Sequence, residues 1–323
     1  MKTNTLLSII IPCFNNGKYI YECLDSLPFE YTDLIEVIII NDGSTDNSVP
    51  EIHRFISAHE SKNKNILLIN KSNQGVSIAR NIGIEVAKSK YITFLDADDL
   101  WSPKLWEMIE PVLLHNQPDM IIYNASRFYD DNKDDLSPLT VTKLKNGYHT
   151  INHINELSSV FQANGWFAWC RVYKKEMFEK IKFPEYREYE DLAIIPTITM
   201  NVKSIFSISD GLVLYRSRVN SITKTPKIKH IDDIIYAMES LYYSFLNSCK
   251  DELTKNVLSK SMQHEYGLLR SVNKKVYGYC YFTIEQRKKI KMILKPFQHK
   301  FKLSLRFKAI FIDLYNIIAK KWH

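Results

Sequence analysis

Several features that mark common enzyme classes are missing from this sequence of 323 residues. No GxGxxG follows the first apolar run, which disfavours a nicotinamide or flavin dinucleotide cofactor, and the absence of GxxxxGK(S/T) excludes a P-loop. The five cysteines are scattered without a CxxC pair, so neither a zinc ribbon nor a redox dithiol is supported. Reduced thiols in a cytosolic compartment fit this pattern best.

Long apolar runs and evenly spread positive charge are missing as well. No stretch approaches the roughly 18 apolar residues that a membrane span needs, and Leu6–Ile11 is too short for the core of a signal peptide. The net charge is +7, but residues 285–323 carry eleven Lys/Arg against two acids, which leaves the first 284 residues near −2. The basic character therefore belongs to the tail.

Short apolar runs alternate with amphipathic segments in the first hundred residues. The runs are rich in β-branched residues and bounded by turn residues, which predicts buried strands of a parallel sheet. The predicted strands are Leu6–Ile11, Ile35–Ile40, Ile66–Ile69 and Tyr91–Leu95, with helices predicted over Tyr19–Leu27, Asp46–His59 and Val76–Ala87. Strand starts recur every 25 to 31 residues, about the length of a βαβ unit. We therefore expect a doubly wound α/β sheet with its ligand site at the carboxyl ends of the strands.

The pattern changes beyond residue 100. A helix is expected to start at Ser102-Pro103, a fifth strand covers Met120–Tyr123, and the acidic stretch Asp130–Asp135 is predicted to be an exposed loop. Residues from about 150 to 225 mix helix and short strand. Apolar residues then recur at three- and four-residue spacing, which predicts helices over Ile231–Leu246, Glu252–Leu269 and Lys302–Ala319.

The turns that follow the first four strands all carry polar, small or acidic residues. These turns are Pro12–Gly17, Asn41–Ser44, Asn73–Gly75 and Asp96–Asp99. Because the carboxyl ends of parallel strands lie at one edge of a sheet, the four turns are expected to converge on one site.

Three carboxylates lie within four residues after the fourth strand: Asp96, Asp98 and Asp99. They repel one another and are costly beside a buried sheet unless a cation sits there. Hard oxygen ligands suit Mg²⁺ or Mn²⁺, which would bridge the phosphates of a nucleotide. An acidic loop that caps the next helix is the alternative explanation of the same residues.

Two further residues on this edge have both a functional and an ordinary explanation. Asp42 can accept hydrogen bonds from a ribose or a base, or it can belong to a turn before a helix. Arg80 can contact a diphosphate, or it can be a solvated helix residue.

Polar residues also gather between residues 183 and 223. The adjacent acids Glu190 and Asp191 are flanked by aromatic and aliphatic residues, which can raise the pKa of one of them and suit a general base. A helix N-terminus that attracts acids is the alternative. Arg216 and Arg218 either close over a diphosphate or belong to an ordinary transition from a strand to a loop. The aromatic cluster of Trp166, Phe167 and Trp169 indicates core packing or a platform for a sugar.

Six of these segments together resemble glycosyltransferase family 2, whose members are inverting bacterial transferases with a GT-A fold. They occur in the family's order and cover about residues 5 to 225. The matching segments are Ser8–Asn15, Ile38–Asp46, Asn73–Asn81, Phe94–Asp99, Phe183-Pro184 with Glu190–Leu192, and Tyr215-Arg216 with Asn220–Ile222.

The resemblance implies donor-binding roles for residues of the first strands and of the last. Pro12, Phe14 and Asp42 look like the uridine-binding positions, while Arg80 and Arg216 look like contacts on the diphosphate side. Phe14 stands where the family often has Tyr, which removes a hydroxyl but keeps a stacking surface. Asn41 stands where many members have an acid, which leaves Asp42 as the main carboxylate that reads the nucleotide.

The resemblance also implies a division of labour among the acids. Asp96 resembles the first acid of the DxD motif, close to the ribose and the metal, and Asp98 resembles the direct ligand of Mn²⁺ or Mg²⁺. Asp99 would face the donor sugar or the acceptor. Asp191 resembles the general base, with Glu190 in support.

The implied fold is a GT-A fold, Rossmann-like with a doubly wound and mostly parallel sheet, followed by a helical and basic C-terminal extension. Residues 1–100 are expected to form the half that binds the nucleotide sugar, 101–225 the acceptor half and 226–323 the extension. The implied activity transfers a sugar from a UDP-sugar to a saccharide or lipid-linked saccharide in bacterial cell-surface polysaccharide biosynthesis. The alternatives are a nucleotidyltransferase that makes a sugar nucleotide and a non-catalytic scaffold that binds one.

The basic tail at residues 285–323 alternates Lys/Arg with Phe, Leu, Ile and Met. This pattern is typical of a helix that lies on an anionic membrane surface, and it predicts a cytoplasmic protein peripheral on the inner face of the cell membrane. A face packed on the catalytic body and a homo-oligomer contact are the alternatives. Nucleic acid is disfavoured as a partner because no recognisable motif accompanies the charge.

Overall fold

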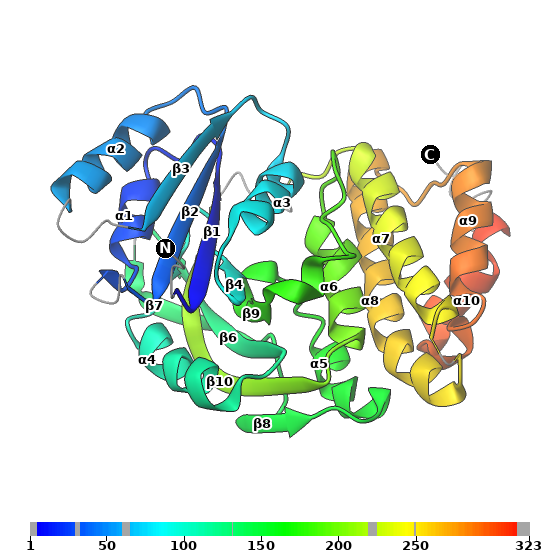
Figure 1. The fold of residues 1–323 in the computed structure, drawn as a ribbon. Helices are drawn as coiled ribbons and strands as arrows, with labels where there is room; N and C mark the ends of the chain where they lie inside the picture. Colours follow the sequence, from blue (N-terminus) through cyan, green and yellow to red (C-terminus); the bar gives the residue numbers. More distant parts are fainter. Residues whose placement is uncertain are drawn as a thin grey trace. The chain divides into compact units, whose positions relative to one another are not determined.

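The computed structural model describes residues 5–29, 33–59, 65–130, 132–218, 225–248 and 250–314. The chain divides into two units (Figure 1). The first comprises residues 1–151, 167–186 and 202–218, and the second comprises 152–166, 187–201 and 219–323. The two units interleave along the chain. The division into a donor half, an acceptor half and an extension stays a prediction.

The first unit contains one mixed sheet with both parallel and antiparallel strand pairs. Its order is β3-β2-β1-β4-β9-β6-β10-β5, with β7 paired to β6 and β8 paired to β10. Strands β1 to β4 are parallel, and the antiparallel β9 joins them to the parallel pair β6 and β10. The bounds are β1 Leu7–Cys13, β2 Ile35–Asp42, β3 Ile66–Lys71, β4 Tyr91–Phe94, β5 Leu100–Trp101, β6 Met120–Tyr129, β7 Asn132–Leu139, β8 Gly147–Thr150, β9 Arg171–Lys174 and β10 Ser204–Arg216.

The central strands are buried on both faces, as their continuous apolar runs predict. Every residue of β1, β2 and β4 is buried, because helices lie on both sides of them. Helix α3 packs against β1 and β2, while α1 and α2 lie on the other side of these strands (Figure 1). The helices of this unit are α1 Ile20–Asp25, α2 Ser48–Ala58, α3 Val76–Val86 and α4 Lys104–Pro111, with short helical turns at Val112–Asn116, Ala168–Cys170 and Lys175–Phe178.

The acidic stretch Asp130–Asp135 is not the loop predicted from its composition. Residues from Asn132 onward form β7, which pairs antiparallel with β6, with Tyr129 opposite Asn132 and Ala125 opposite Leu139. The residues of β7 up to Pro138 whose side chains the structure describes are exposed, so the predicted exposure is correct. Charged residues are common on edge strands because they discourage pairing with another chain. The backbone pairing here is set by β6 rather than by the local side chains.

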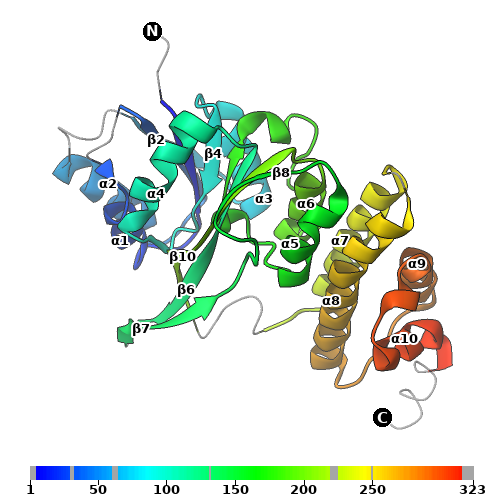
Figure 2. The ribbon, with the colours of Figure 1, turned by 90° about the horizontal axis from the view of Figure 1, so that it is seen from below.

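The second unit is helical, as predicted for residues beyond 230. Helix α7 packs against α6, α8 and α9 (Figure 2). Asp251 caps α8 by accepting the N–H of Thr254 at 2.7 Å, and Gly278 ends it with φ of 80°. The bounds are α5 Ser158–Ala163, α6 Glu190–Met200, α7 Lys229–Leu246, α8 Glu252–Tyr277, α9 Ile284–Leu294 and α10 Leu303–Ile310, with short turns at Ile154–Leu157 and Gln298–Lys300. The predicted end of the last helix, after residue 314, lies outside the described residues.

A carboxyl group lies in the core of this helical unit. Glu265 on α8 is fully buried. Its Oε1 accepts the Ser261 hydroxyl at 3.1 Å, and the Ser261 oxygen accepts the indole N–H of Trp166 at 2.9 Å. Its Oε2 has no hydrogen-bonding partner in the described part of the chain. Burial raises the pKa of Glu265 to about 8, although the hydrogen bond from Ser261 lowers it in part.

Glu265→Gln is expected to stabilise the protein in a pH-dependent way. Above pH 4.5 the unfolded chain releases this proton while the folded chain keeps it up to about pH 8, so the stability of the wild type falls through that window. Gln cannot ionise, so the variant should gain about 5 kcal/mol over the wild type above pH 8 and almost nothing near pH 4. Urea unfolding at pH 4, 6 and 9 measures the difference.

The control is Glu252→Gln, at the exposed start of the same helix. Its effect should not grow between pH 6 and 9. A gain for Glu265→Gln that is equal at all three pH values would contradict a protonated Glu265.

Candidate functional site

The turns after β1 and β2 are held together by side chain to backbone hydrogen bonds. Asn15 has a left-handed backbone with φ of 52°, and its side chain accepts the N–H of Thr45 at 2.8 Å. The Asn16 N–H donates to Ser48 Oγ at 2.8 Å, and the Gly17 N–H donates to Asp46 at 2.9 Å. The predicted convergence of these two turns is therefore present. Phe14 projects from this edge with 46% of its surface exposed, while Pro12 is buried in β1.

Asp42 ends β2 and joins it to the start of α3. Its Oδ1 accepts the Gln74 N–H at 2.9 Å, its Oδ2 accepts the Gly75 N–H at 2.7 Å, and Lys71 forms an ion pair with it. Gly43 follows with φ of 73°, where a Cβ would lie 2.6 Å from the Asn73 nitrogen. Only glycine lets these two turns approach so closely. The role of Asp42 in reading a nucleotide stays a prediction.

Asp96 is the partly exposed member of the acidic cluster and is paired with Arg80. Arg80 Nη2 lies 3.0 Å from Asp96 Oδ1, and the guanidinium lies 5.9 Å and 5.2 Å from the ring centres of Phe94 and Phe183. The side-chain amide of Asn81 holds the backbone of Phe183, accepting its N–H and donating to its carbonyl, both at 2.9 Å. Arg80 is thus a buried residue beneath Asp96, not the solvated helix residue of the alternative reading.

Asp98 and Asp99 are both buried, which is costly for two neighbouring carboxyl groups. Burial raises the pKa of Asp98 to about 6; the charge of Arg218 lowers it and that of Asp96 raises it. Burial also raises the pKa of Asp99 well above its usual range, and the charges of Asp98 and Asp96 add to this. Both carboxyl groups therefore hold a proton at higher pH than usual unless a cation lies close to them.

Each acid of this pair has a different partner. Arg218 Nη2 lies 2.5 Å from Asp98 Oδ2. Asp99 Oδ1 accepts the backbone N–H of Arg216 at 2.8 Å, whereas Asp99 Oδ2 is buried without a hydrogen-bonding partner among the described residues. This orphaned buried oxygen is the clearest sign on this edge that the site is completed by something bound there.

Arg216 at the end of β10 is buried and holds the turn Asp96–Asp99 that follows β4. Its side chain is 1% exposed, its Nε donates to the carbonyl of Asp98 at 2.7 Å and its Nη2 lies 2.9 Å from Glu22. Its Nη1 forms an ion pair with Asp130. Partial burial would raise the pKa values of Glu22 and Asp130, but Arg216 lowers both, together with Lys133 at Glu22 and Lys18 at Asp130. A direct contact of Arg216 with a diphosphate stays a prediction.

The sequence model of the family described as "Glycosyl transferase family 2" matches residues 8–182, more than half of the chain. The chain belongs to glycosyltransferase family 2. It is 27% identical over 264 residues to the uncharacterised glycosyltransferase EpsJ of Bacillus subtilis, covering 77% of this chain and 73% of EpsJ. It is 28% identical over 231 residues to the glycosyltransferase GlyG of Streptococcus pneumoniae, covering 68% and 73%.

A solved structure confirms the predicted GT-A type of fold. TarS of S. aureus in complex with UDP-GlcNAc is similar with a TM-score of 0.74, covering 98% of this chain and 89% of that chain at 16% identity. At this identity the likeness shows the fold alone. The mostly parallel sheet and the helical C-terminal region expected from the sequence are therefore both present.

The acids of this family 2 glycosyltransferase do not form a closed metal cage. In the part of the chain that the structure describes, no group of three or more His, Cys, Asp or Glu side chains converges as a metal site. A divalent cation would fit here only with few protein ligands, the remaining ones coming from a bound diphosphate and water, as Mg²⁺ commonly does. Asp98 suits this role because its carboxyl group is buried, has a raised pKa and already faces a cation, Arg218.

The remaining predicted residues are divided between the two units. Glu190 and Asp191 are the first two residues of α6, where the helix dipole favours acids. Their catalytic roles stay predictions. The Trp166–Trp169 cluster is divided between the units. Trp166 packs edge-on against Phe161, and Trp169 stacks on Phe167 and on Tyr215. The segment Asn220–Ile222 lies outside the described residues.

Sequence reasoning missed Glu22 and Asp130, the two acids that neutralise Arg216. Glu22 lies on α1 and Asp130 follows β6, so the separations from Arg216 are 194 and 86 residues. No local motif links these positions. The alternation of strands and helices, which predicts that the carboxyl ends meet, was the only signal that could have suggested them.

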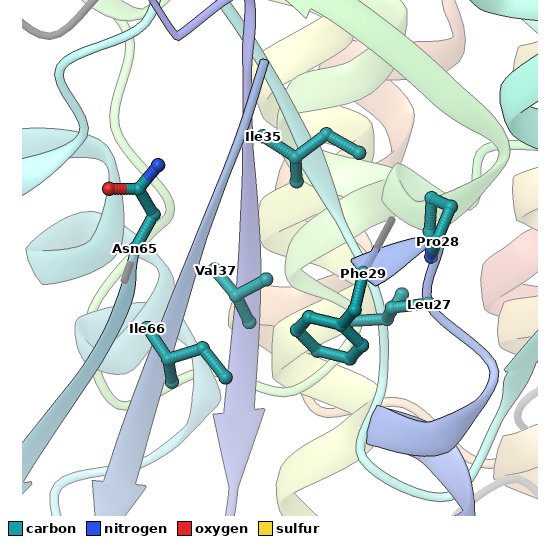
Figure 3. Close-up of a pocket in the computed structure, with 7 residues that line it drawn as sticks. All are labelled: Leu27, Pro28, Phe29, Ile35, Val37, Asn65 and Ile66. Atoms are coloured by element: carbon teal, nitrogen blue, oxygen red, sulfur yellow. The ribbon is translucent and has the colours of Figure 1, made fainter. Parts of the chain in front are cut away.

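Two hollows lie elsewhere on the first unit. The one in Figure 3 has a volume of about 10 Å³ and apolar walls that include Leu27, Phe29 and Val37, close to the start of β2. A wider one of about 720 Å³ lies at the end of α3 and the end of β9, with several lysines and glutamates around it. Neither is lined by the described acids of the turn after β4.

Arg216→Met is expected to destabilise the protein because it leaves Glu22 and Asp130 without their shared cation. Removing one partner of a buried pair costs about 3–5 kcal/mol. Both acids are over a third exposed, so solvent screening should reduce the loss to about 2–3 kcal/mol. Urea unfolding at pH 7 measures it.

Lys133→Met is the matched control, since it removes the exposed partner of the same Glu22. It should cost less than about 1 kcal/mol. Equal losses for the two variants would show that Arg216 is not the hub of this region.

Proposed function

We propose that this glycosyltransferase moves a sugar, with inversion, from a UDP-sugar to a hydroxyl group of a saccharide or lipid-linked saccharide. The product would be a bacterial cell-surface polysaccharide. The observation that carries the proposal is the buried pair Asp98 and Asp99 at the carboxyl end of β4, with raised pKa values and an unsatisfied oxygen. The fold shared with TarS, whose structure contains UDP-GlcNAc, supports a UDP-sugar as donor.

A divalent cation, Mn²⁺ or Mg²⁺, would be held by Asp98, with Asp96 beside it. When bound, it would neutralise the charge that develops on the diphosphate leaving group. Asp98 is favoured over Asp96 as the ligand because its carboxyl group is buried and has a raised pKa, so it gains more from a bound cation than the partly exposed Asp96.

The chain's own residues supply the remaining tasks. The exposed ring of Phe14 offers a stacking surface for the uracil base, and Pro12 and Asp42 would complete the uridine site. Arg80 would act on the diphosphate side through Asp96. Asp99 holds its place through the N–H of Arg216 and can use its second oxygen toward a sugar hydroxyl.

Asp191 would take the proton from the acceptor hydroxyl as that oxygen attacks the anomeric carbon, and Glu190 would support it. The bond from the anomeric carbon to the diphosphate breaks, and UDP leaves. The new linkage is β if the donor is α-linked.

Release of UDP from a panel of UDP-sugars, with p-nitrophenyl glycosides as acceptors, tests the proposal. We expect one UDP-sugar to be used best, and release to require Mn²⁺ or Mg²⁺. Asp191→Asn should lower the transfer rate 10²- to 10⁴-fold, the range for loss of a general base. UDP binding, measured by calorimetry, should stay within about twofold because the base acts on the acceptor.

Three results would contradict parts of the proposal. UDP binding without turnover of any donor would favour the non-catalytic scaffold, and formation of UDP-sugar from UTP and a sugar phosphate would favour the nucleotidyltransferase. Weakened UDP binding with residual transfer in Asp191→Asn would count against Asp191 as the base.

We also propose that the basic C-terminal region lies on an anionic membrane surface. No described helix is both long and apolar enough to pass through a bilayer. On α10 and just beyond it, exposed apolar residues recur on one helix face; they are Leu303, Phe307, Ile310, Phe311 and Leu314. Arg306 and Lys308 accompany them. An exposed apolar stripe with basic neighbours is typical of a helix at a membrane interface.

The membrane proposal predicts that the full chain pellets with phosphatidylglycerol vesicles and not with phosphatidylcholine vesicles. The double variant Leu303→Ser, Phe307→Ser should lose most of this binding, because it removes apolar area from the stripe. Raising the salt to 0.5 M should weaken binding of the wild type.

The matched control is Tyr243→Ser, Leu253→Ser, which removes two exposed apolar side chains from α7 and α8. It should pellet like the wild type. Equal pelleting of the stripe variant and the wild type would contradict the proposal.

A further inference from the structure

Two of the three residues before α6 are bound to α7 by a single buried carboxylate. Asp233 on α7 is 5% exposed. Its Oδ1 lies 3.0 Å from Arg187 Nη1, and its Oδ2 accepts the backbone N–H of Glu188 at 3.2 Å. The Arg187 guanidinium also lies over the ring of Tyr236, 4.2 Å from its centre. One side chain of α7 therefore fixes two consecutive residues of this segment.

A second connection runs from Glu188 to the first turn of α7. Lys229 Nζ lies 2.5 Å from Glu188 Oε1, and His230 Nε2 lies 2.5 Å from Glu188 Oε2. His230 Nδ1 accepts the backbone N–H of Lys227 at 3.1 Å, which assigns the imidazole proton to Nε2, the atom that faces Glu188. Partial burial would raise the pKa of Glu188, but Lys229 and His230 lower it, so this acid stays ionised.

His230 is fully buried and cannot reach a substrate itself. An imidazole that faces a carboxylate can serve as a proton shuttle at an open site, but this one has no exposed surface. Nδ1 instead accepts from the backbone of Lys227 and Nε2 lies against the Glu188 carboxylate, which is the arrangement of a group that holds another segment in place.

The residue that this network surrounds has a strained backbone. Tyr189 has φ of 60° and ψ of 31°, a left-handed conformation that a bulky residue adopts rarely. Its ring lies edge-on to that of His230, with 5.6 Å between centres. Such a conformation persists only where its surroundings hold it. Tyr189 immediately precedes Glu190, so its conformation sets the direction of the first turn of α6.

We propose that Glu188 and His230 are positioning residues. They hold Tyr189 in its left-handed conformation and so fix the direction of Asp191. The inference rests on the proposed function, because positioning Asp191 affects the reaction only if Asp191 is the general base. A misplacement of about 1 Å in a catalytic group can cost on the order of 10²-fold in rate. The network therefore acts on the rate of transfer rather than on the binding of the donor.

The test measures kcat, the KM for the UDP-sugar and UDP affinity in the full chain for Glu188→Gln, His230→Leu and His230→Gln. We expect kcat to fall about 10- to 100-fold in the first two, with KM and UDP affinity within about twofold. His230→Gln should recover part of the lost rate, because its amide can place an N–H beside the Glu188 carboxylate as Nε2 does, whereas Leu keeps the bulk and offers no N–H. A role in packing alone would not give Gln this advantage.

Glu239→Gln is the control, since it breaks a 2.7 Å ion pair between Glu239 on α7 and Lys289 without touching the turn before α6. It should keep the wild-type kcat. Unchanged kcat in both Glu188→Gln and His230→Leu, while Asp191→Asn is inactive, overturns this inference and leaves the proposed function intact. Full transfer by Asp191→Asn overturns the proposed base, and the inference with it. If His230→Leu does not fold, Glu188→Gln decides alone.

Discussion

The site in the first unit depends on the contacts of one buried group, the guanidinium of Arg216. It contacts the carbonyl of Asp98 and is balanced by Glu22 and Asp130, so three segments distant in the sequence meet on one side chain. A charge that is 1% exposed is tolerable only when it is paired. The end of β10, the turn after β4 and the residue that follows β6 must therefore fold together, so Arg216 restrains the turn after β4.

The same constraint explains how two adjacent carboxyl groups can be buried. The N–H of Arg216 supports one oxygen of Asp99, and Arg218 faces Asp98, yet one oxygen of Asp99 is left unsatisfied in the described structure. Such an arrangement works against stability, and perturbed acids of this kind concentrate at functional sites. Arg216 holds the site in place. The buried Asp99 oxygen that has no hydrogen-bonding partner among the described residues favours binding of a cation or of a ligand with a hydroxyl group.

In the second unit the unfavourable feature that is held in place is a backbone conformation, not a buried charge. Tyr189 takes an unfavourable conformation directly before Glu190, and side chains from α7 hold it there. In both units an unfavourable feature lies beside a predicted functional residue, and a buried polar side chain distant in the sequence keeps it in place. Local strain of this kind survives because the surrounding packing determines the conformation.

The sequence by itself determined the parallel strands, the polar turns at their carboxyl ends, the helical C-terminal region and the family, because each rests on short-range periodicity or contiguous motifs. The position of Asp98 after a buried strand belongs with these. Tertiary structure alone decided that Asp130 lies between two paired strands and contacts Arg216, that Arg80 is buried beneath Asp96, and that His230 lies against Glu188. These contacts join residues up to 194 positions apart. A side chain's partner at such separation is chosen by the register of strands and the packing of helices, which no local pattern encodes.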